Sequence, residues 1–178
     1  TTCEASVARQ ADLVVRNETA GTVTRYVVLD GDGLGTPQPT AGVELDFYLP
    51  QSITVEDSCA TVANAPELTT GEHHYTGDLG GLGPDLDLQD PGPSCTGYES
   101  SGQDGMLRVR LEPGETLEVD YVRRGGDGVV YLLETCTDTT TALACDDNTF
   151  FAPGIDAPEH FVYTHTGSTA LEGVLVLD

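Results

Sequence analysis

The chain has 178 residues, of which 38% are hydrophobic, with 21 Gly, 10 Pro and no Trp. Glycine and proline interrupt helices and suit tight turns, and no stretch shows a sustained helical period, so many short strands and an all-β fold are predicted. Seven basic against thirty acidic residues give a net charge of −23. Such a charge argues against binding to nucleic acid and to anionic membranes. It suits calcium binding, or solubility alone.

Three strands are predicted in the first part of the chain. Asp12–Asn17 and Thr22–Asp30 are rich in β-branched residues. Gly42–Leu49 alternates between apolar and polar side chains, which is the period of a half-buried strand. Its apolar positions are Val43, Leu45, Phe47 and Leu49, and Glu44, Asp46 and Tyr48 lie between them.

The clearest hairpin signal lies in the sequence MLRVRL-EPGE-TLEVDY, where Pro113 and Gly114 supply the turn. Leu107, Val109 and Leu111 share one face of the first arm, and Leu117, Val119 and Tyr121 share one face of the second. We therefore expect the two arms to pair as neighbours. Val129–Leu133 is a predicted buried strand, and His160–Thr164 and Gly173–Leu177 are predicted strands that complete the chain.

An internal repeat divides the chain. DLVVRNETAGTVTRYVVLD (12–30) aligns with EHFVYTHTGSTALEGVLVLD (159–178) with a one-residue gap. Chance similarity between two β-hairpins is the alternative. The first copy continues to the Gly42–Leu49 strand and the second stops at Asp178. Residues 1–57 are thus expected to be the C-terminal part of one unit, and residues 58–178 a nearly whole unit that lacks its last strand.

The five cysteines are Cys3, Cys59, Cys95, Cys136 and Cys145, and none forms a C-x-x-C pair, which argues against zinc-ribbon and thioredoxin chemistry. Cys136 and Cys145 flank a polar loop at a separation suited to a small disulfide. Cys59 and Cys95 bracket a Gly/Pro/Asp-rich stretch, where a bridge would contribute roughly 3–4 kcal/mol. Two bridges indicate an extracellular or cell-surface location and leave Cys3 for an intermolecular bond.

Two acidic clusters are candidate calcium sites, because calcium takes roughly six to eight oxygen ligands. They are Asp30 with Asp32, and Asp146 with Asp147 and Asn148. The alternative is that these residues populate turns for backbone reasons. Neither a G-x-S-x-G elbow nor an H-E-x-x-H motif occurs, so the chain is not expected to be an enzyme.

Several of these features together resemble the bacterial pre-peptidase C-terminal (PPC) domain. They are Ser58-Cys59, Cys95, the G-x-D-G of residues 102–105 with MLRVRLEPGETLEVDY, GDGVVYLLETC, the Cys136–Cys145 loop, and EHFVYTHT with VLVLD. The resemblance covers Ser58–Asp178, and its end occurs again over Thr1–Leu49. It implies an antiparallel, jelly-roll-like, disulfide-bonded β-sandwich without catalytic activity. Such domains are appended to secreted hydrolases or strung in surface arrays, and some bind calcium or extracellular polymers. The chain departs from the pattern at Cys3, which has no nearby partner, and after Asp178, where the last strand is missing.

Three functions fit these observations. The first is a self-assembling structural or adhesive subunit, joined head to tail into a filament by strand complementation, with Val43, Leu45, Phe47 and Leu49 as the donor strand and Cys3 as a lock. The second is a polysaccharide- or protein-binding accessory module of a secreted hydrolase. The third is a fragment of a tandem array. The expected partner is another copy or an extracellular polymer, with no nucleic acid and no membrane insertion.

Overall fold

The structure, a computed structural model, describes residues 50–86, 102–123, 128–147 and 158–178. The chain divides into two units, Thr1–Leu45 and Asp46–Asp178, and every described residue belongs to the second. The division expected after residue 57 stays a prediction. The strands expected within residues 12–49, and with them the first copy of the repeat, lie outside the described residues.

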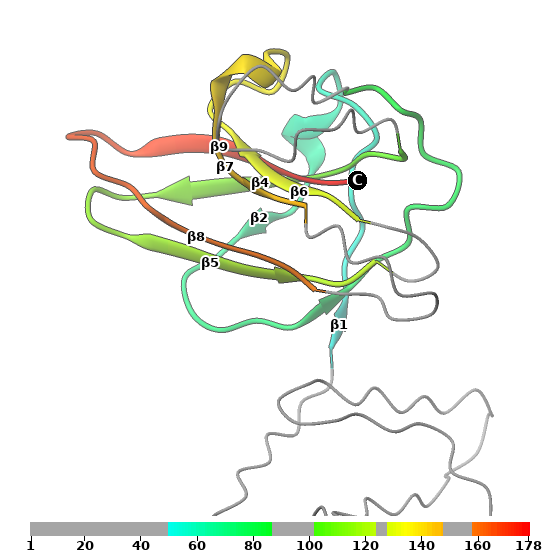
Figure 1. The fold of residues 1–178 in the computed structure, drawn as a ribbon, viewed down its shortest axis with the longest axis horizontal. Coiled ribbons are helices and arrows are strands. Elements are labelled where there is room, and N and C mark those ends of the chain that lie inside the picture. The colour runs from blue at the N-terminus through cyan, green and yellow to red at the C-terminus, as the bar shows by residue number, and fades with distance from the viewer. Residues whose placement is uncertain (1–49, 87–101, 124–127, 148–157) are drawn as a thin grey trace, which may run out of the picture. The chain divides into compact units, whose positions relative to one another are not determined.

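The described residues form strands and two short 3-10 helices (Figure 1), so the expectation of an all-β fold is confirmed. In chain order the elements are β1 (Gln51–Ser52), η1 (Val62–Asn64), β2 (Glu67–Leu68), β3 (Tyr75–Thr76), β4 (Gly105–Leu111), β5 (Thr116–Tyr121), β6 (Val130–Leu133), η2 (Thr139–Thr141), β7 (Ala142–Asp146), β8 (Glu159–Thr164) and β9 (Leu171–Leu177). A five-stranded sheet has the order β2-β4-β9-β6-β7, and only its β2–β4 pair is parallel. Two smaller sheets are formed by β5 with β8, antiparallel, and by β1 with β3, parallel.

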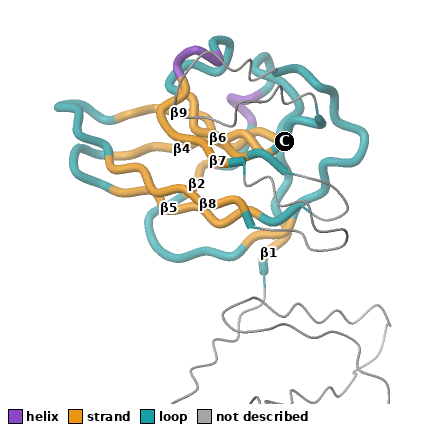
Figure 2. The backbone as a smooth tube through the Cα atoms, in the orientation of Figure 1, coloured by secondary structure: helices purple, strands orange, loops and turns teal. Residues whose placement is uncertain are grey.

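The main core lies between the five-stranded sheet and the β5–β8 sheet (Figure 2). It takes alternate side chains from each strand, as the period of a strand requires. The five-stranded sheet contributes Leu107, Val109, Leu111, Val130, Leu132, Leu171 and Leu175, and the opposite sheet contributes Leu117, Val119, Tyr121, Phe161 and Tyr163. Full burial of each large apolar side chain stabilises the fold by about 1.5–3 kcal/mol.

The other face of the five-stranded sheet is buried as well. A second cluster joins Leu86, Met106, Tyr131, Leu133, Val174 and Val176, with Cys59, Val62 and Cys136 packed against it. Because both faces are covered, all four residues of β6 are buried. The buried strand predicted over Val129–Leu133 is therefore confirmed, to within one residue at its start.

The disulfide that the structure shows joins Cys59 to Cys136, with their Cα atoms 5.6 Å apart. The pairings expected from spacing, Cys59 with Cys95 and Cys136 with Cys145, are therefore wrong for both Cys59 and Cys136. The segment between Cys136 and Cys145 is not the plain polar loop that the sequence indicated. It forms η2 and then β7, which pairs with β6 and places Cys145 opposite Tyr131. Cys145 is also disulfide-bonded, whereas Cys3 and Cys95 lie outside the described residues.

The hairpin expected between β4 and β5 is also wrong. Strand β4 pairs with β9, and β5 pairs with β8, so the turn after Leu111 crosses from one sheet to the other. The connection between β8 and β9 crosses back in the same way. The two crossings are joined to each other, because the Gly114 N–H donates to the His165 carbonyl at 2.8 Å and the His165 N–H donates to the Glu115 carbonyl at 2.8 Å. Both arms still turn their apolar faces to one core, but from opposite sides.

Candidate functional site

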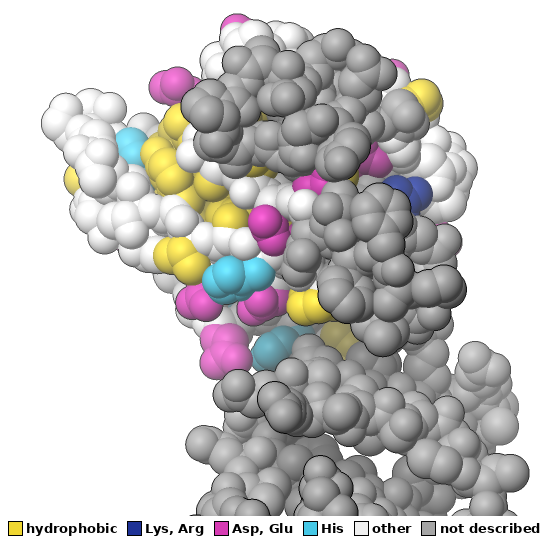
Figure 3. All heavy atoms as spheres, in the orientation of Figure 1, with side chains coloured by type: hydrophobic (Ala, Val, Ile, Leu, Met, Phe, Trp, Pro, Cys, Tyr) yellow, Lys and Arg dark blue, Asp and Glu magenta, His cyan; other side chains and the backbone are white. Residues whose placement is uncertain are grey.

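The β5–β8 sheet has one face in the core and one face exposed. Outward-facing residues alternate with the core residues along both strands, and their register pairs Thr116 with Thr164, Glu118 with Val162, and Asp120 with His160. Acidic and histidine side chains gather on this face with hydrophobic ones beside them (Figure 3). We call these six residues the outer face.

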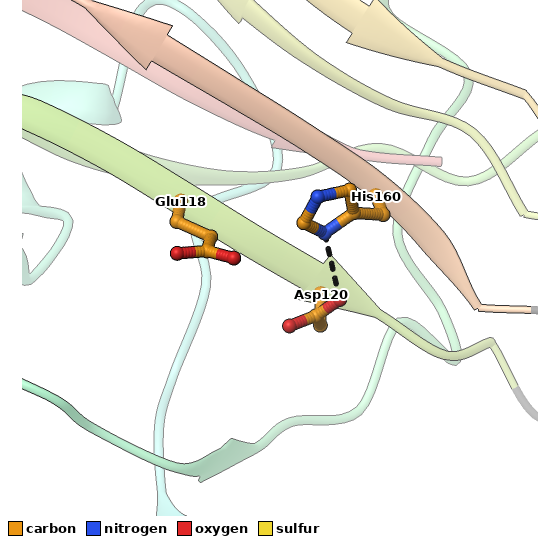
Figure 4. Close-up of side chains that lie close together, drawn as sticks. All are labelled: Glu118, Asp120 and His160. Atoms are coloured by element: carbon orange, nitrogen blue, oxygen red, sulfur yellow. Dashed lines mark hydrogen bonds and ion pairs between the residues drawn. The ribbon is translucent and has the colours of Figure 1, made fainter. Parts of the chain in front are cut away.

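Three residues of the outer face lie close enough to hold a metal ion. Each of Glu118, Asp120 and His160 offers one ligand atom, and these three atoms lie within 4.8 Å of one another. All three side chains are exposed. The two carboxylates are two residues apart on β5 and so point the same way, and His160 is the cross-strand neighbour of Asp120. His160 Nδ1 lies 2.9 Å from Asp120 Oδ1 (Figure 4).

One of the predicted calcium ligands lies beside this cluster. Asp146 Oδ2, at the end of β7, accepts a hydrogen bond of 2.8 Å from the His160 backbone N–H. Asp147 is described but is not one of the three clustered residues. Asp30, Asp32 and Asn148 lie outside the described residues, as do Val43, Leu45, Phe47 and Leu49 of the expected donor strand. Their proposed roles stay predictions.

The same hydrogen bond shows how β5 presents its backbone. In an antiparallel pair, residue pairs that exchange backbone hydrogen bonds alternate with pairs that do not. The His160 N–H points to Asp146 and the His165 N–H points to Glu115, which fixes the phase of this alternation. The backbone N–H and C=O groups of Thr116, Glu118 and Asp120 therefore point away from β8. Among the described residues, no strand pairs with that edge.

Burial also marks β5 as an edge. On β8, the inward-facing Phe161 is only 6% exposed. Its partner Val119 on β5, like Leu117 and Tyr121, is half-buried although it faces the same core. The apolar side of β5 is thus incompletely covered along the edge that pairs with no strand of the described residues.

A second group of acids is interior rather than exposed. Asp104 and Asp178 are buried, and Asp104 Oδ2 accepts a hydrogen bond of 2.6 Å from the Leu86 N–H. Burial raises the pKa of Asp104 to about 6, against the effect of the Leu86 N–H and with a further rise from the charge of Asp178. Burial likewise raises the pKa of Tyr121 to about 12. Asp104 and Asp178 are buried and Tyr121 packs against the main core, so these groups are structural.

The candidate site is largely one that the sequence did not predict. The alternation of Glu118 and Asp120 within TLEVDY was visible, but His160 is 40 residues away and only the β5–β8 pairing brings it there.

No protein-family model, curated protein or solved structure matches the chain. The resemblance to the PPC domain therefore stays an expectation. None of the helices in the described residues has the length and apolar character needed to cross a membrane.

Proposed function

We propose that the chain is a non-catalytic, extracellular structural or adhesive module that binds its partner by adding a strand to the open edge of β5. The observation that carries this proposal is the row of backbone groups at Thr116, Glu118 and Asp120 that point away from β8 and that no strand of the described residues pairs with. An exposed row of this kind is a template for another strand, and backbone hydrogen bonds supply much of the affinity when a peptide extends a sheet. Disulfide bonding supports the extracellular location.

Natural sheets block exposed edges with proline, bulges or lysine. The β5 sequence TLEVDY has no proline, its pairing with β8 runs without a register shift, and all seven basic residues of the chain are arginines. Its edge therefore carries no proline, bulge or lysine, and the charged side chains on it, Glu118 and Asp120, are both negative. A two-stranded sheet is also marginal by itself, so a third strand would stabilise this side of the sandwich.

Amide hydrogen exchange, read residue by residue, tests this proposal. In the free chain, the amides of Thr116, Glu118 and Asp120 should exchange quickly, while the alternate amides of Leu117, Val119 and Tyr121 should be protected by β8. A bound strand should protect the first set and leave the second unchanged. The measurement is repeated at high protein concentration and with a panel of extended peptides of different charge. If nothing in the panel protects the edge amides, the proposal is wrong.

The sequence predicts a sharper form of this function, in which the added strand is Gly42–Leu49 of a neighbouring copy and Cys3 locks the joint. Sedimentation of the intact chain, with and without reductant, tests this form against a chain that lacks residues 1–49. Assembly that disappears on deletion supports the filament. A monomer at all concentrations, or assembly that survives the deletion, overturns it.

We also propose that calcium binds at Glu118 and Asp120. Two carboxylates are hard oxygen donors that suit calcium, whereas the His160 imidazole suits zinc. Calcium should be coordinated by the two carboxylates and by water, and His160 should stay hydrogen-bonded to Asp120. The Kd for calcium should be roughly 0.1–1 mM, the range of extracellular calcium-binding modules. Calorimetry should then show that Asp120→Asn abolishes binding and His160→Gln leaves it unchanged. Loss of binding in both variants, or binding of zinc alone, overturns calcium.

A further inference from the structure

We propose that the strand added at the β5 edge belongs to a different polypeptide, whose Lys or Arg side chains alternate with apolar ones. This inference rests on the strand-accepting function proposed above and assigns the chemistry of the partner. It is argued from the inner side of the edge, from the outer face, and from the charge of the chain itself.

The inner side of the edge requires apolar residues. Leu117, Val119 and Tyr121 pack against the main core and remain half-buried. A strand added beside β5 would place every second side chain next to these three residues. Apolar side chains at those positions would complete the burial, whereas charged ones would be desolvated without a partner.

The outer face requires positive charge. The intervening side chains of an added strand would stand opposite Thr116, Glu118 and Asp120. Opposite charges that face each other across a strand pair are stabilising. Val162 lies beside Glu118 in the register and is 55% exposed, which gives the apolar stem of a lysine or arginine a surface to cover. The outer face holds no lysine or arginine that would compete.

The same chemistry disfavours a second copy of this chain. If Val43, Leu45 and Phe47 of a neighbour faced the core, Glu44 and Asp46 would lie on the outer face. Like charges directly opposite one another destabilise a strand pair, and here they would meet Glu118 and Asp120. Two copies would in addition each carry a net charge of −23. The acidic donor strand is therefore a poorer occupant than a basic one.

The test compares three synthetic peptides of equal length that alternate valine with lysine, with glutamate or with threonine. Each is titrated into the full chain by calorimetry at low and at moderate salt. The lysine peptide should bind at least about fivefold more tightly than the glutamate peptide. Each attractive or repulsive pair changes the affinity by roughly 1.5- to 5-fold, and the exchange turns repulsion into attraction at both Glu118 and Asp120. Salt should reduce this difference, because exposed charges are screened.

Variants of the edge separate charge from backbone pairing. Glu118→Gln and Asp120→Asn should each weaken the lysine peptide by a few fold. Glu172→Gln, which removes one exposed charge from β9, is the matched control and should have no effect. Glu118→Pro should weaken binding beyond Glu118→Gln, because it removes an edge N–H that the β5–β8 pairing does not use. Thermal unfolding checks that both Glu118 variants remain folded.

A charge reversal gives a readout that a folding defect cannot imitate. The double variant Glu118→Lys with Asp120→Lys should prefer the glutamate peptide.

Equal affinity of the wild-type chain for the lysine and glutamate peptides would overturn the basic partner while leaving strand addition intact. Absence of edge protection with every peptide would overturn strand addition itself. Self-association through residues 42–49 would assign the edge to a second copy and also overturn this inference.

Discussion

Asp104 shows how a short sequence motif takes its meaning from the fold. It belongs to the G-x-D-G of residues 102–105, and its carboxylate is wholly buried at the start of β4. Oδ2 accepts the Leu86 N–H, and the effects of the Leu86 and Asp85 backbone N–H groups on the pKa are outweighed by burial. Asp178 lies near enough for its charge to raise the pKa of Asp104 further. An ionised Asp104 is therefore a cost to the folded state.

This arrangement predicts a pH dependence of stability. Because burial raises the pKa of Asp104 from 3.8 to about 6, the folded state binds a proton more tightly than the unfolded state. The contribution of Asp104 to the free energy of unfolding should therefore be most favourable below pH 4. It should fall as the pH rises to about 6. Asp104→Asn should remove that fall and raise the free energy of unfolding at pH 7 by about 2–3 kcal/mol.

Urea unfolding of both proteins between pH 3.5 and 8 is the measurement for Asp104→Asn. Its control is Asp138→Asn, which changes an exposed carboxylate that caps η2 and should leave the slope between pH 4 and 6 in place. If Asp104→Asn lowers the stability at pH 7 instead, the ionised form has a stabilising partner and the interpretation is wrong.

Gly105, the last residue of the same motif, is needed for packing. A Cβ atom at this position would overlap Leu79 Cδ2 and lie 2.8 Å from Val55 Cγ2. Both side chains belong to the main core, so Gly105→Ala should lower the free energy of unfolding by about 1–3 kcal/mol through overpacking. Gly114→Ala is the comparison, because its Cβ would meet nothing within 4 Å and its cost would come from its φ of +87°. Equal stability of Gly105→Ala and wild type in urea would contradict this packing.

At the scale of elements, the sequence predicted strands better than it predicted their partners. The alternation in MLRVRL and TLEVDY correctly gave two strands and the face that each turns to the core. The same alternation arises whether two strands share a sheet or face each other across a core, so the short EPGE turn predicts a hairpin that the structure does not form. Long-range pairing with β8 and β9 decided the outcome, and nothing local to the turn records it.

The same limit explains which parts of the site were predictable. Glu118 and Asp120 follow from a strand with acidic outward positions, which is visible locally. The presence of His160 in the site and the position of the open edge both depend on which strand pairs with β5. That pairing is set by residues far away in the sequence. The cysteine pairing failed for a related reason, since spacing along the chain says little once Cys59 and Cys136 meet across a gap of 77 residues.

The disulfide predicts a large loss of stability on removal. It ties the segment that covers the second core cluster to the residues just after β6, and Cys136 Sγ lies 3.7 Å from Met106 Sδ in that cluster. For a closed loop of this length, the chain-entropy relation gives about 4.5 kcal/mol. The double variant Cys59→Ser with Cys136→Ser should lose this amount in urea unfolding. Peptide mapping that finds a Cys59–Cys95 or Cys136–Cys145 link would refute the pairing.

Charge is the dominant feature of the chain taken together. A net charge of −23 disfavours a compact state through self-repulsion, and two of the acids sit side by side on the outer face. The few arginines are used locally, as where Arg110 pairs with both Glu112 and Glu172. Exposed pairs of this kind contribute little individually, so they offset only a small part of the repulsion.

The chain should therefore become more stable as salt is added. Screening by 0.5 M NaCl should raise the free energy of unfolding by on the order of 1 kcal/mol, or about 2–4 °C in Tm for a chain of this size.

Calcium compared with magnesium at equal ionic strength separates screening from ion binding at Glu118 and Asp120. Calcium should add a further rise that saturates and that Asp120→Asn removes, because an ion bound only to the folded state stabilises it by mass action. If calcium and magnesium give identical curves in both proteins, screening accounts for the whole effect and no calcium site is needed.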